Sequence, residues 1–200
     1  MKLDIHHLPF RISYIKRRLP LFSGWELEAV KGFIYLRDGI DYVNNDKRYD
    51  HALEHLHRAY EQLYALHPED VVSLARLCLW IGIALNENED LDKVQRNKDA
   101  IIEYKKGLEW IKHRVGEDTK AIRMSLHNSY GVAIHHLNIG RGDHHIPKEA
   151  FYHYRAARAL FHRNPDNIFM KRIMKKVETN TGYIIQRGGA YSIVSCNDAC

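Results

Sequence analysis

Small and large apolar residues follow one another in the same order in three stretches of the chain. In each stretch a small residue is followed by a large apolar residue four positions later and by a second small residue three positions after that: Ala52, Leu56, Ala59; Ala100, Tyr104, Gly107; and Ala150, Tyr154, Ala157. This spacing places all three residues on one face of an α-helix. Small residues at both ends of the face let a neighbouring helix approach closely, and the large residue fills the space between them. Each stretch is therefore predicted to form one helix of a packed helical pair.

The other helix of each pair is predicted upstream, around a glycine. Gly39, Gly82 and Gly131 precede the first small residue of the three stretches by 13, 18 and 19 residues, and those first residues are themselves 48 and 50 positions apart. Recurrence at a nearly fixed interval is typical of stacked helical repeats. Apolar periodicity and end signals predict helices over 25–44, 50–67, 71–86, 94–115, 118–139, 148–163 and 166–186. The chain is therefore expected to be all-α, with three antiparallel helix pairs and a closing helix.

The order of a glycine, a large apolar residue three positions later, and then alanine, a large residue and a small residue resembles the tetratricopeptide repeat (TPR) over roughly residues 25–165. The resemblance implies three long TPR-like pairs stacked as a right-handed superhelix. Tyr35, Cys78 and His127 stand where the family often carries tryptophan, and the spacing exceeds the usual length of about 34 residues, with insertions expected in the turns 86–94 and 140–147. The expected organisation is a basic segment over 1–24, the repeat domain over 25–187 and a glycine-rich tail over 188–200.

Composition bounds the class of protein. The 200 residues are 45% hydrophobic and 28% charged, which suits one domain with a continuous core. No run approaches the roughly 18 uninterrupted apolar residues of a membrane span, residues 1–9 contain no long apolar signal region, and the three cysteines fit a reducing compartment. These features predict a cytoplasmic protein. The tail carrying Cys196 and Cys200 is expected to be frayed; the alternative is a functional tail that is chemically modified or held by a neighbour.

The net charge of +5 is concentrated at the two ends of the chain. Residues 1–20 and residues 169–187 each carry five basic side chains and one acidic side chain, so that the rest sums to −3. Within the second segment the candidates for binding phosphate or an acidic partner are Lys171, Arg172, Lys175 and Lys176. Alternatively these residues form the polar outer face that the last repeat of a solenoid needs for solubility.

No catalytic signature is present, so a non-enzymatic protein is expected: the sequence lacks a nucleophile elbow, a phosphate loop and a zinc-protease motif. His51 with His55, and the adjacent pairs 135–136 and 144–145, have spacings that can ligate zinc or copper, but no cysteine or carboxylate completes a recognisable site. Neither a metal nor a cofactor is expected. Arg141, Gly142 and Asp143 spell an adhesion tripeptide and are expected to form a turn.

In the TPR resemblance the first helix of each pair lines the concave face, which implies that recognition takes place there. Aligning the three glycines with the family pattern places the following residues at groove positions: Phe33, Leu36, Ile40, Val43, Asn44, Arg76, Leu79, Ile83, Asn86, Ser125, Asn128, Val132, His135 and His136. The candidate partner-binding residues among them are Leu36, Ile40, Asn44, Arg76, Leu79, Asn86, Asn128 and His135. The apolar members could equally pack against the adjacent repeat. A mixed apolar and weakly polar groove suits a peptide or an amphipathic helix.

A second resemblance points to another class of ligand. Residues 164–171 and their surroundings, over about twenty residues, are similar to a segment of the interferon-induced proteins with tetratricopeptide repeats, which hold RNA 5′ ends in a basic channel. None of that family's RNA-contacting residues maps onto this chain. The sequence therefore predicts a protein-interaction scaffold that binds a partner's peptide or helix in its concave face. The alternative is an RNA-binding helical-repeat protein that uses the basic helix and the groove.

Overall fold

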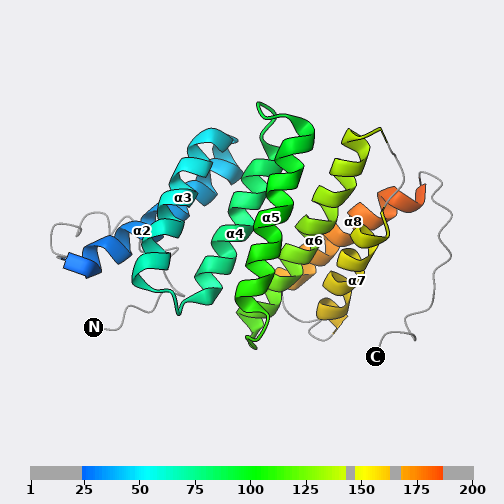
Figure 1. The fold of residues 1–200 in the computed structure, drawn as a ribbon. Helices are drawn as coiled ribbons and strands as arrows, with labels where there is room; N and C mark the ends of the chain where they lie inside the picture. Colours follow the sequence, from blue (N-terminus) through cyan, green and yellow to red (C-terminus); the bar gives the residue numbers. More distant parts are fainter. Residues whose placement is uncertain (1–23, 143–146, 163–167, 187–200) are drawn as a thin grey trace.

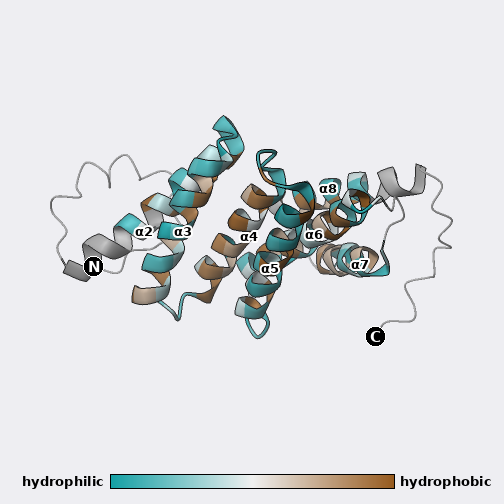
Figure 2. Ribbon diagram, turned by 45° about the horizontal axis from the view of Figure 1, so that its top comes forward, coloured by the Kyte–Doolittle hydropathy of each residue, from teal (hydrophilic) through white to brown (hydrophobic). Residues whose placement is uncertain are grey.

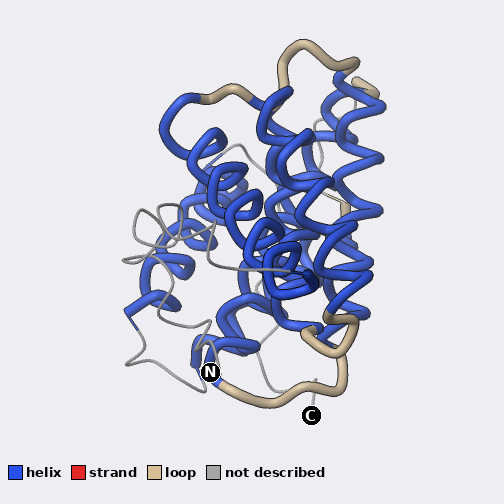
Figure 3. Tube along the Cα trace, turned by 90° about the vertical axis from the view of Figure 1, so that its left-hand side faces the viewer, coloured by secondary structure: helices blue, strands red, loops and turns tan. Residues whose placement is uncertain are grey.

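The structure is a computed structural model that describes residues 24–142, 147–162 and 168–186. These residues form helices joined by short turns, with no strand among them (Figure 3). The elements are α2 (Gly24–Asp41), a π-helical turn η3 (Tyr42–Asp46), α3 (Tyr49–Leu66), α4 (Val71–Glu87), α5 (Lys93–Ile111), α6 (Glu117–Gly140), α7 (Lys148–His162) and α8 (Ile168–Gln186). The predicted all-α class is confirmed. Residues 1–23 of the predicted basic segment and the whole predicted tail, including Cys196 and Cys200, lie outside the described residues.

The helices pack as successive pairs. α2 packs against α3, α4 against α5 and α6 against α7, while α3 also contacts α4, and α5 also contacts α6 (Figure 1). The pairs follow one another in a row, and α8 packs against both α6 and α7 at the end of the row. Sequential neighbours are therefore spatial neighbours along the described chain.

The predicted helical pairs share one packing arrangement. All nine residues of the three small–large–small stripes are buried. In each pair the large residue lies against the glycine of the preceding helix: Leu56 against Gly39, Tyr104 against Gly82, and Tyr154 against Gly131. A β-carbon placed on Gly82 would lie 2.8 Å from Cδ1 and Cζ of Tyr104. The absence of a side chain at these glycines thus sets how closely the two helices approach.

The core consists of two groups of buried side chains that meet at α4. The first group comes from α2, η3, α3 and α4, and the second comes from α4 and the helices that follow it. Leu74 and Leu77 belong to the first group and Leu79 to the second, while Ile83 and Trp110 pack against both. Figure 2 shows α4 as mostly hydrophobic between the more hydrophilic α3 and α5. Each fully buried leucine stabilises the fold by about 1.5–3 kcal/mol through removal of apolar surface from water.

α5 ends at Ile111, four residues earlier than the periodicity predicts. The guanidinium group of Arg123, on α6, donates to the backbone carbonyl groups of Ile111, Lys112 and Arg114. Carbonyl groups at the end of a helix lack a donor within the helix, and the carbonyl of Ile111 also accepts the backbone N–H of Arg114 in the turn that follows. A side chain from the next helix therefore fixes the end of α5, and Gly116 then starts α6 with a φ of 146° that favours glycine.

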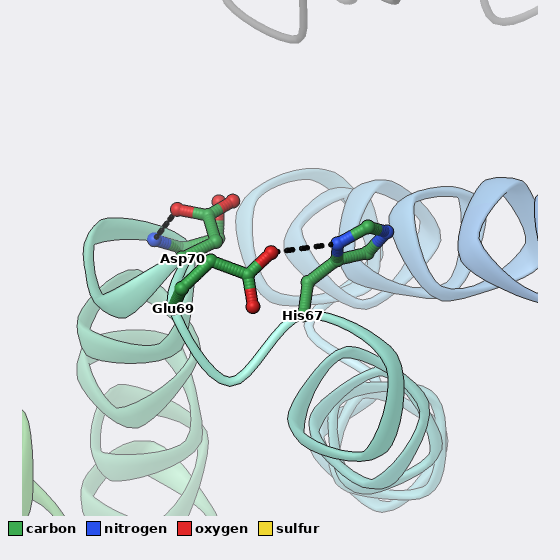
Figure 4. Close-up of polar contacts among 4 residues, drawn as sticks. His67, Glu69 and Asp70 are labelled. Carbon is green, nitrogen blue, oxygen red and sulfur yellow. Dashed lines mark hydrogen bonds and ion pairs between the residues drawn. The ribbon is translucent and has the colours of Figure 1, made fainter.

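Side-chain caps fix the starts of the two central helices. Oδ1 of Asp70 accepts the backbone N–H of Ser73 at 3.1 Å, and Oδ1 of Asp92 accepts the N–H groups of Val94 and Gln95. In the turn before α4, the imidazole of His67 contacts Oε1 of Glu69 at 3.0 Å (Figure 4). Each cap satisfies backbone N–H groups that lack a partner within the helix.

The turn after α6 is as the sequence predicts up to Gly142, whose φ of 83° requires glycine's backbone freedom. Asp143, the last residue of the tripeptide, lies outside the described residues. Within the part of the chain that the structure describes, no helix is both long enough and apolar enough to cross a bilayer.

Candidate functional site

The predicted groove residues of α2 and η3 differ in accessibility. Leu36 and Val43 are buried in the first core group, Ile40 is half-buried against it, and Asn44 is exposed in the π-helical turn. The side chain of Phe33 lies outside what the structure describes. Ile40 and Asn44 are therefore the members of this set that a partner can contact without rearrangement of the core.

On α4 the predicted residues divide in the same way. Leu79 and Asn86 are buried, whereas Arg76 and Ile83 are half-buried. The buried Oδ1 of Asn86 has no hydrogen-bond partner among the described residues. Arg76 likewise forms neither a hydrogen bond nor an ion pair with any side chain in the described ranges. Among the described residues Arg76 is thus a half-buried cation with no anionic partner, and its guanidinium group is available to a bound anion.

On α6 the closing helix covers part of the predicted surface. Asn128 is buried, and its Oδ1 accepts the amide N–H of Asn180 from α8 at 3.1 Å. Ser125, Val132, His135 and His136 are half-buried. Burial lowers the pKa of His136, and the positive charges of Lys93 and Arg96 lower it further. The amide oxygen of Asn128 is therefore hydrogen-bonded within the fold, while the side chain of His135 stays partly exposed.

The eight candidate partner-binding residues thus fall into two groups. Leu36, Leu79, Asn86 and Asn128 are buried, and Ile40, Asn44, Arg76 and His135 are at least partly exposed. Exposure is a precondition for contact with a partner and does not establish it. Partner binding by all eight residues stays a prediction.

The four basic residues of α8 lie on its solvent face. Met170, Met174 and Val177 are buried on one side of the helix. The opposite side carries Lys171, Arg172, Lys175 and Lys176, all exposed and none in an ion pair with another described residue. On α7, Lys148, Arg155 and Arg158 are also exposed. The described parts of α7 and α8 thus carry seven basic side chains against Glu149 and Glu178, and the basic face points away from the core rather than into it.

His51 and His55 of α3 contact aromatic rings. The ring of His55 lies 5.2 Å from that of Tyr42 and 5.5 Å from that of Tyr35, and His51 lies 5.8 Å from Tyr42. Across the described ranges, no three side chains of the histidine, cysteine, aspartate or glutamate types gather in a way that could hold a metal ion. His144 and His145 fall outside those ranges.

A polar pair that the sequence did not indicate joins α6 to α7. Nδ1 of His127 lies 2.9 Å from Nδ1 of His153, and the ring of Tyr130 stacks on His153 with centroids 3.9 Å apart. Burial lowers the pKa of both histidines to about 4. The sequence offered one signal for this pair, which was the position of the two histidines. His127 stands where the repeat pattern often has tryptophan, and His153 directly precedes Tyr154 of the third stripe.

An aromatic cluster on α3 and α5 was likewise not indicated. Tyr60 and Tyr64 stack with ring centroids 5.9 Å apart, Trp110 meets Tyr64 edge-on, and Nζ of Lys106 lies 3.9 Å from the centre of the Tyr60 ring. The contacts join the first helix pair to the second. In this cluster Lys106 lies over the face of the Tyr60 ring, an arrangement that stabilises the cation.

Comparisons of the chain with protein-family models, with curated proteins and with solved structures returned no match.

Proposed function

We propose that the chain is a non-enzymatic protein-interaction scaffold, built from TPR-like helix pairs, that binds a peptide or helix of a partner protein in the concave face of a right-handed superhelix. The repeated contact between a glycine and a large residue in three successive pairs supports the repeat architecture. Units that pack in the same way along a row present their equivalent helices on one continuous surface. That surface is the proposed binding groove.

The observation that carries the proposal is the state of Arg76. Its side chain is half-buried on the first helix of the central pair and has no anionic partner among the described residues. Half-buried apolar side chains such as Ile40 and Ile83 lie on the first helices of the first and second pairs. An amphipathic helix or peptide with an acidic side chain satisfies both features: its apolar face covers the isoleucines and its carboxylate pairs with the guanidinium group.

The proposal is tested by affinity capture with variants that carry acidic substitutions. The groove variant combines Ile40→Asp with Arg76→Glu, and the matched control combines Ile102→Asp with Lys105→Glu, which are both exposed on α5. We expect the unmodified chain and the control to recover the same partner proteins from lysate, and the groove variant to lose them while keeping its helical circular dichroism spectrum. Equal recovery by both variants would contradict binding in the groove.

The basic face of α8 favours a second candidate function, which is binding of RNA through its phosphates. Lys171, Arg172, Lys175 and Lys176 are exposed together with no neutralising partner among the described residues. Affinity that arises from such contacts falls steeply as the salt concentration rises. The reason is that basic side chains release counterions from the phosphates when they bind, and added salt opposes this release. Fluorescence anisotropy with a short single-stranded RNA is the test. Reversal of the four charges should abolish RNA binding, and the control variant with Ile102→Asp and Lys105→Glu should still bind. If the unmodified chain does not bind RNA at low salt, this function is excluded.

A further inference from the structure

A polar contact between α6 and α7 joins two imidazole rings. Nδ1 of His127 and Nδ1 of His153 are 2.9 Å apart, and the two ring centroids are 5.2 Å apart. His153 is 6% exposed. The ring of Tyr130 stacks on one side of His153 and the ring of Tyr152 meets it edge-on at 5.3 Å. The pair is therefore held in place by packing on both helices.

A hydrogen bond between two Nδ1 atoms needs one N–H donor and one lone-pair acceptor. The contact thus requires two neutral rings in opposite tautomers, or a pair that carries a single extra proton on a distal nitrogen. When both Nδ1 atoms are protonated, two donors face each other at hydrogen-bond distance and the contact becomes repulsive. One ring must then leave its position, and His153 cannot leave without losing its stacking on Tyr130.

The surroundings provide little compensation for added positive charge. On α6, Arg123 already places a positive charge near His127 and lowers its pKa, after burial and the effect of His153. Glu149, on α7, acts on the phenol of Tyr130 and raises its pKa after burial. From α5, the ring of Tyr104 lies beside that of Tyr130, and from α8 the contact with α6 is the uncharged amide of Asn180 on Asn128. Burial of both rings and the positive charge of Arg123 near His127 thus favour neutral imidazoles, whereas the negative charge of Glu149 acts on Tyr130.

We propose that the His127–His153 contact is an acid-sensitive latch that holds α7 against α6 at neutral pH and releases α7, together with α8, when both rings are protonated. α8 is included because it packs against both helices of the pair. Release would uncover Asn128 and the adjoining face of α6, which α8 covers in the closed state. The latch does not depend on which partner the groove binds.

The direction of the pH dependence follows from the protonation states. The pKa of each histidine is about 4 in the closed state, below the ordinary value of about 6.5 that applies when the ring is exposed. The open state therefore binds more protons between these values. Stability of the closed state is full above about pH 6.5 and is lost as the pH falls toward 4.

Hydrogen exchange of the full chain at pH 7 and pH 5, corrected for the intrinsic pH dependence of amide exchange, tests the proposal. We expect the protection of α7 and α8 to fall by a factor on the order of 10 between the two pH values, whereas protection of α4 stays within about twofold. An equal fall in every helix, or no fall in α7, would overturn the latch.

The matched variants are His153→Phe, which keeps a ring for Tyr130 to stack on and removes the nitrogen, and His57→Gln at an exposed position of α3. The first should abolish the selective acid response of α7 and the second should retain it. If His153→Phe does not fold, an NMR titration of the imidazole rings in the unmodified chain gives the answer. Rings of His127 and His153 that stay neutral until α7 opens support the latch, and rings that titrate near pH 6.5 with α7 still protected exclude it.

Discussion

The phenol ring of Tyr154 lies directly against the backbone of Gly131, so that a β-carbon on this glycine would be 2.8, 3.0 and 3.1 Å from three of its ring carbons. Contacts below about 3 Å do not occur between carbon atoms in well-packed interiors, where the separation is about 3.5–4.0 Å. Tyr154 is itself 2% exposed, so that its ring is enclosed by the core. The glycine therefore sets the distance between α6 and α7.

Replacing this glycine should destabilise the protein. In Gly131→Ala the new methyl group collides with Tyr154, at a cost of about 1–3 kcal/mol for overpacking, which exceeds the gain of up to about 1 kcal/mol from the better helix former. Gly140→Ala is the control, because its β-carbon would be 3.4 Å from the nearest side-chain atom, Cγ2 of Val94. Urea unfolding should show a lower midpoint for the first variant and an unchanged or higher midpoint for the second. A Gly131→Ala protein as stable as the unmodified chain would refute the close contact.

The start of α4, which Figure 4 shows, offers a second test. Asp70→Ala removes the acceptor of the Ser73 N–H group and should lower the free energy of unfolding by about 1 kcal/mol. The neighbouring Glu69 is exposed, and its contact with His67 is open to solvent, so that Glu69→Ala should leave stability unchanged. Thermal unfolding of the two variants in parallel distinguishes a helix cap from a surface contact. Equal destabilisation by both would show that the acidic charge, rather than the cap, matters in this turn.

Arg123 is predicted to hold the end of α5. Arg123→Met keeps the aliphatic part of the side chain and removes the donors to the carbonyl groups of Ile111 and Arg114, which should cost about 1–3 kcal/mol. Hydrogen exchange should accelerate locally over residues 111–116, ahead of any change in α4. Lys105→Met, on the exposed face of α5, is the matched control and should leave the exchange pattern unaltered. Unchanged exchange in Arg123→Met would contradict the capping role.

The thiol of Cys78 should be inert while the protein is folded. Burial raises the pKa of this thiol above its ordinary value, and the negative charge of Glu103 raises it further. In a variant with Cys196→Ser and Cys200→Ser, Cys78 is the single thiol of the chain. An aromatic disulfide reagent at pH 8 should then react only after urea unfolds the protein. Reaction at the rate of a free thiol in native buffer would mean that α4 is not enclosed as described.

The sequence predicted those features of the fold that produce a periodic pattern over a short stretch of chain. Small–large–small stripes such as Ala150, Tyr154 and Ala157 identified buried faces, and Gly131 identified the opposing helix, because both signals lie within one or two helical turns. The end of α5 was not predictable, since it depends on Arg123, which lies beyond the next turn in the chain. The same limit applies to Asn128, whose partner Asn180 is 52 residues away.

The candidate site was predictable only in part, for a related reason. A repeat pattern assigns Leu36, Leu79 and Asn86 to the same helical faces as Ile40 and Arg76, but it does not say which of them neighbouring helices cover. Burial depends on the packing of α3, α5 and α8 around those faces. The pairing of His127 with His153 is of this kind too, since 26 residues separate two side chains that meet only when α6 and α7 pack.

Site-specific photocrosslinking tests the proposed groove most directly. A photoreactive amino acid replaces Asn44 or His135 in the proposed groove, and replaces Glu61 or Ile102, which are exposed on α3 and α5, in the control chains. We predict that irradiation in cells crosslinks the same partner protein from positions 44 and 135 and not from positions 61 and 102. Crosslinks from the two control positions alone, or equal crosslinks from all four, would contradict a scaffold that binds its partner in the concave face.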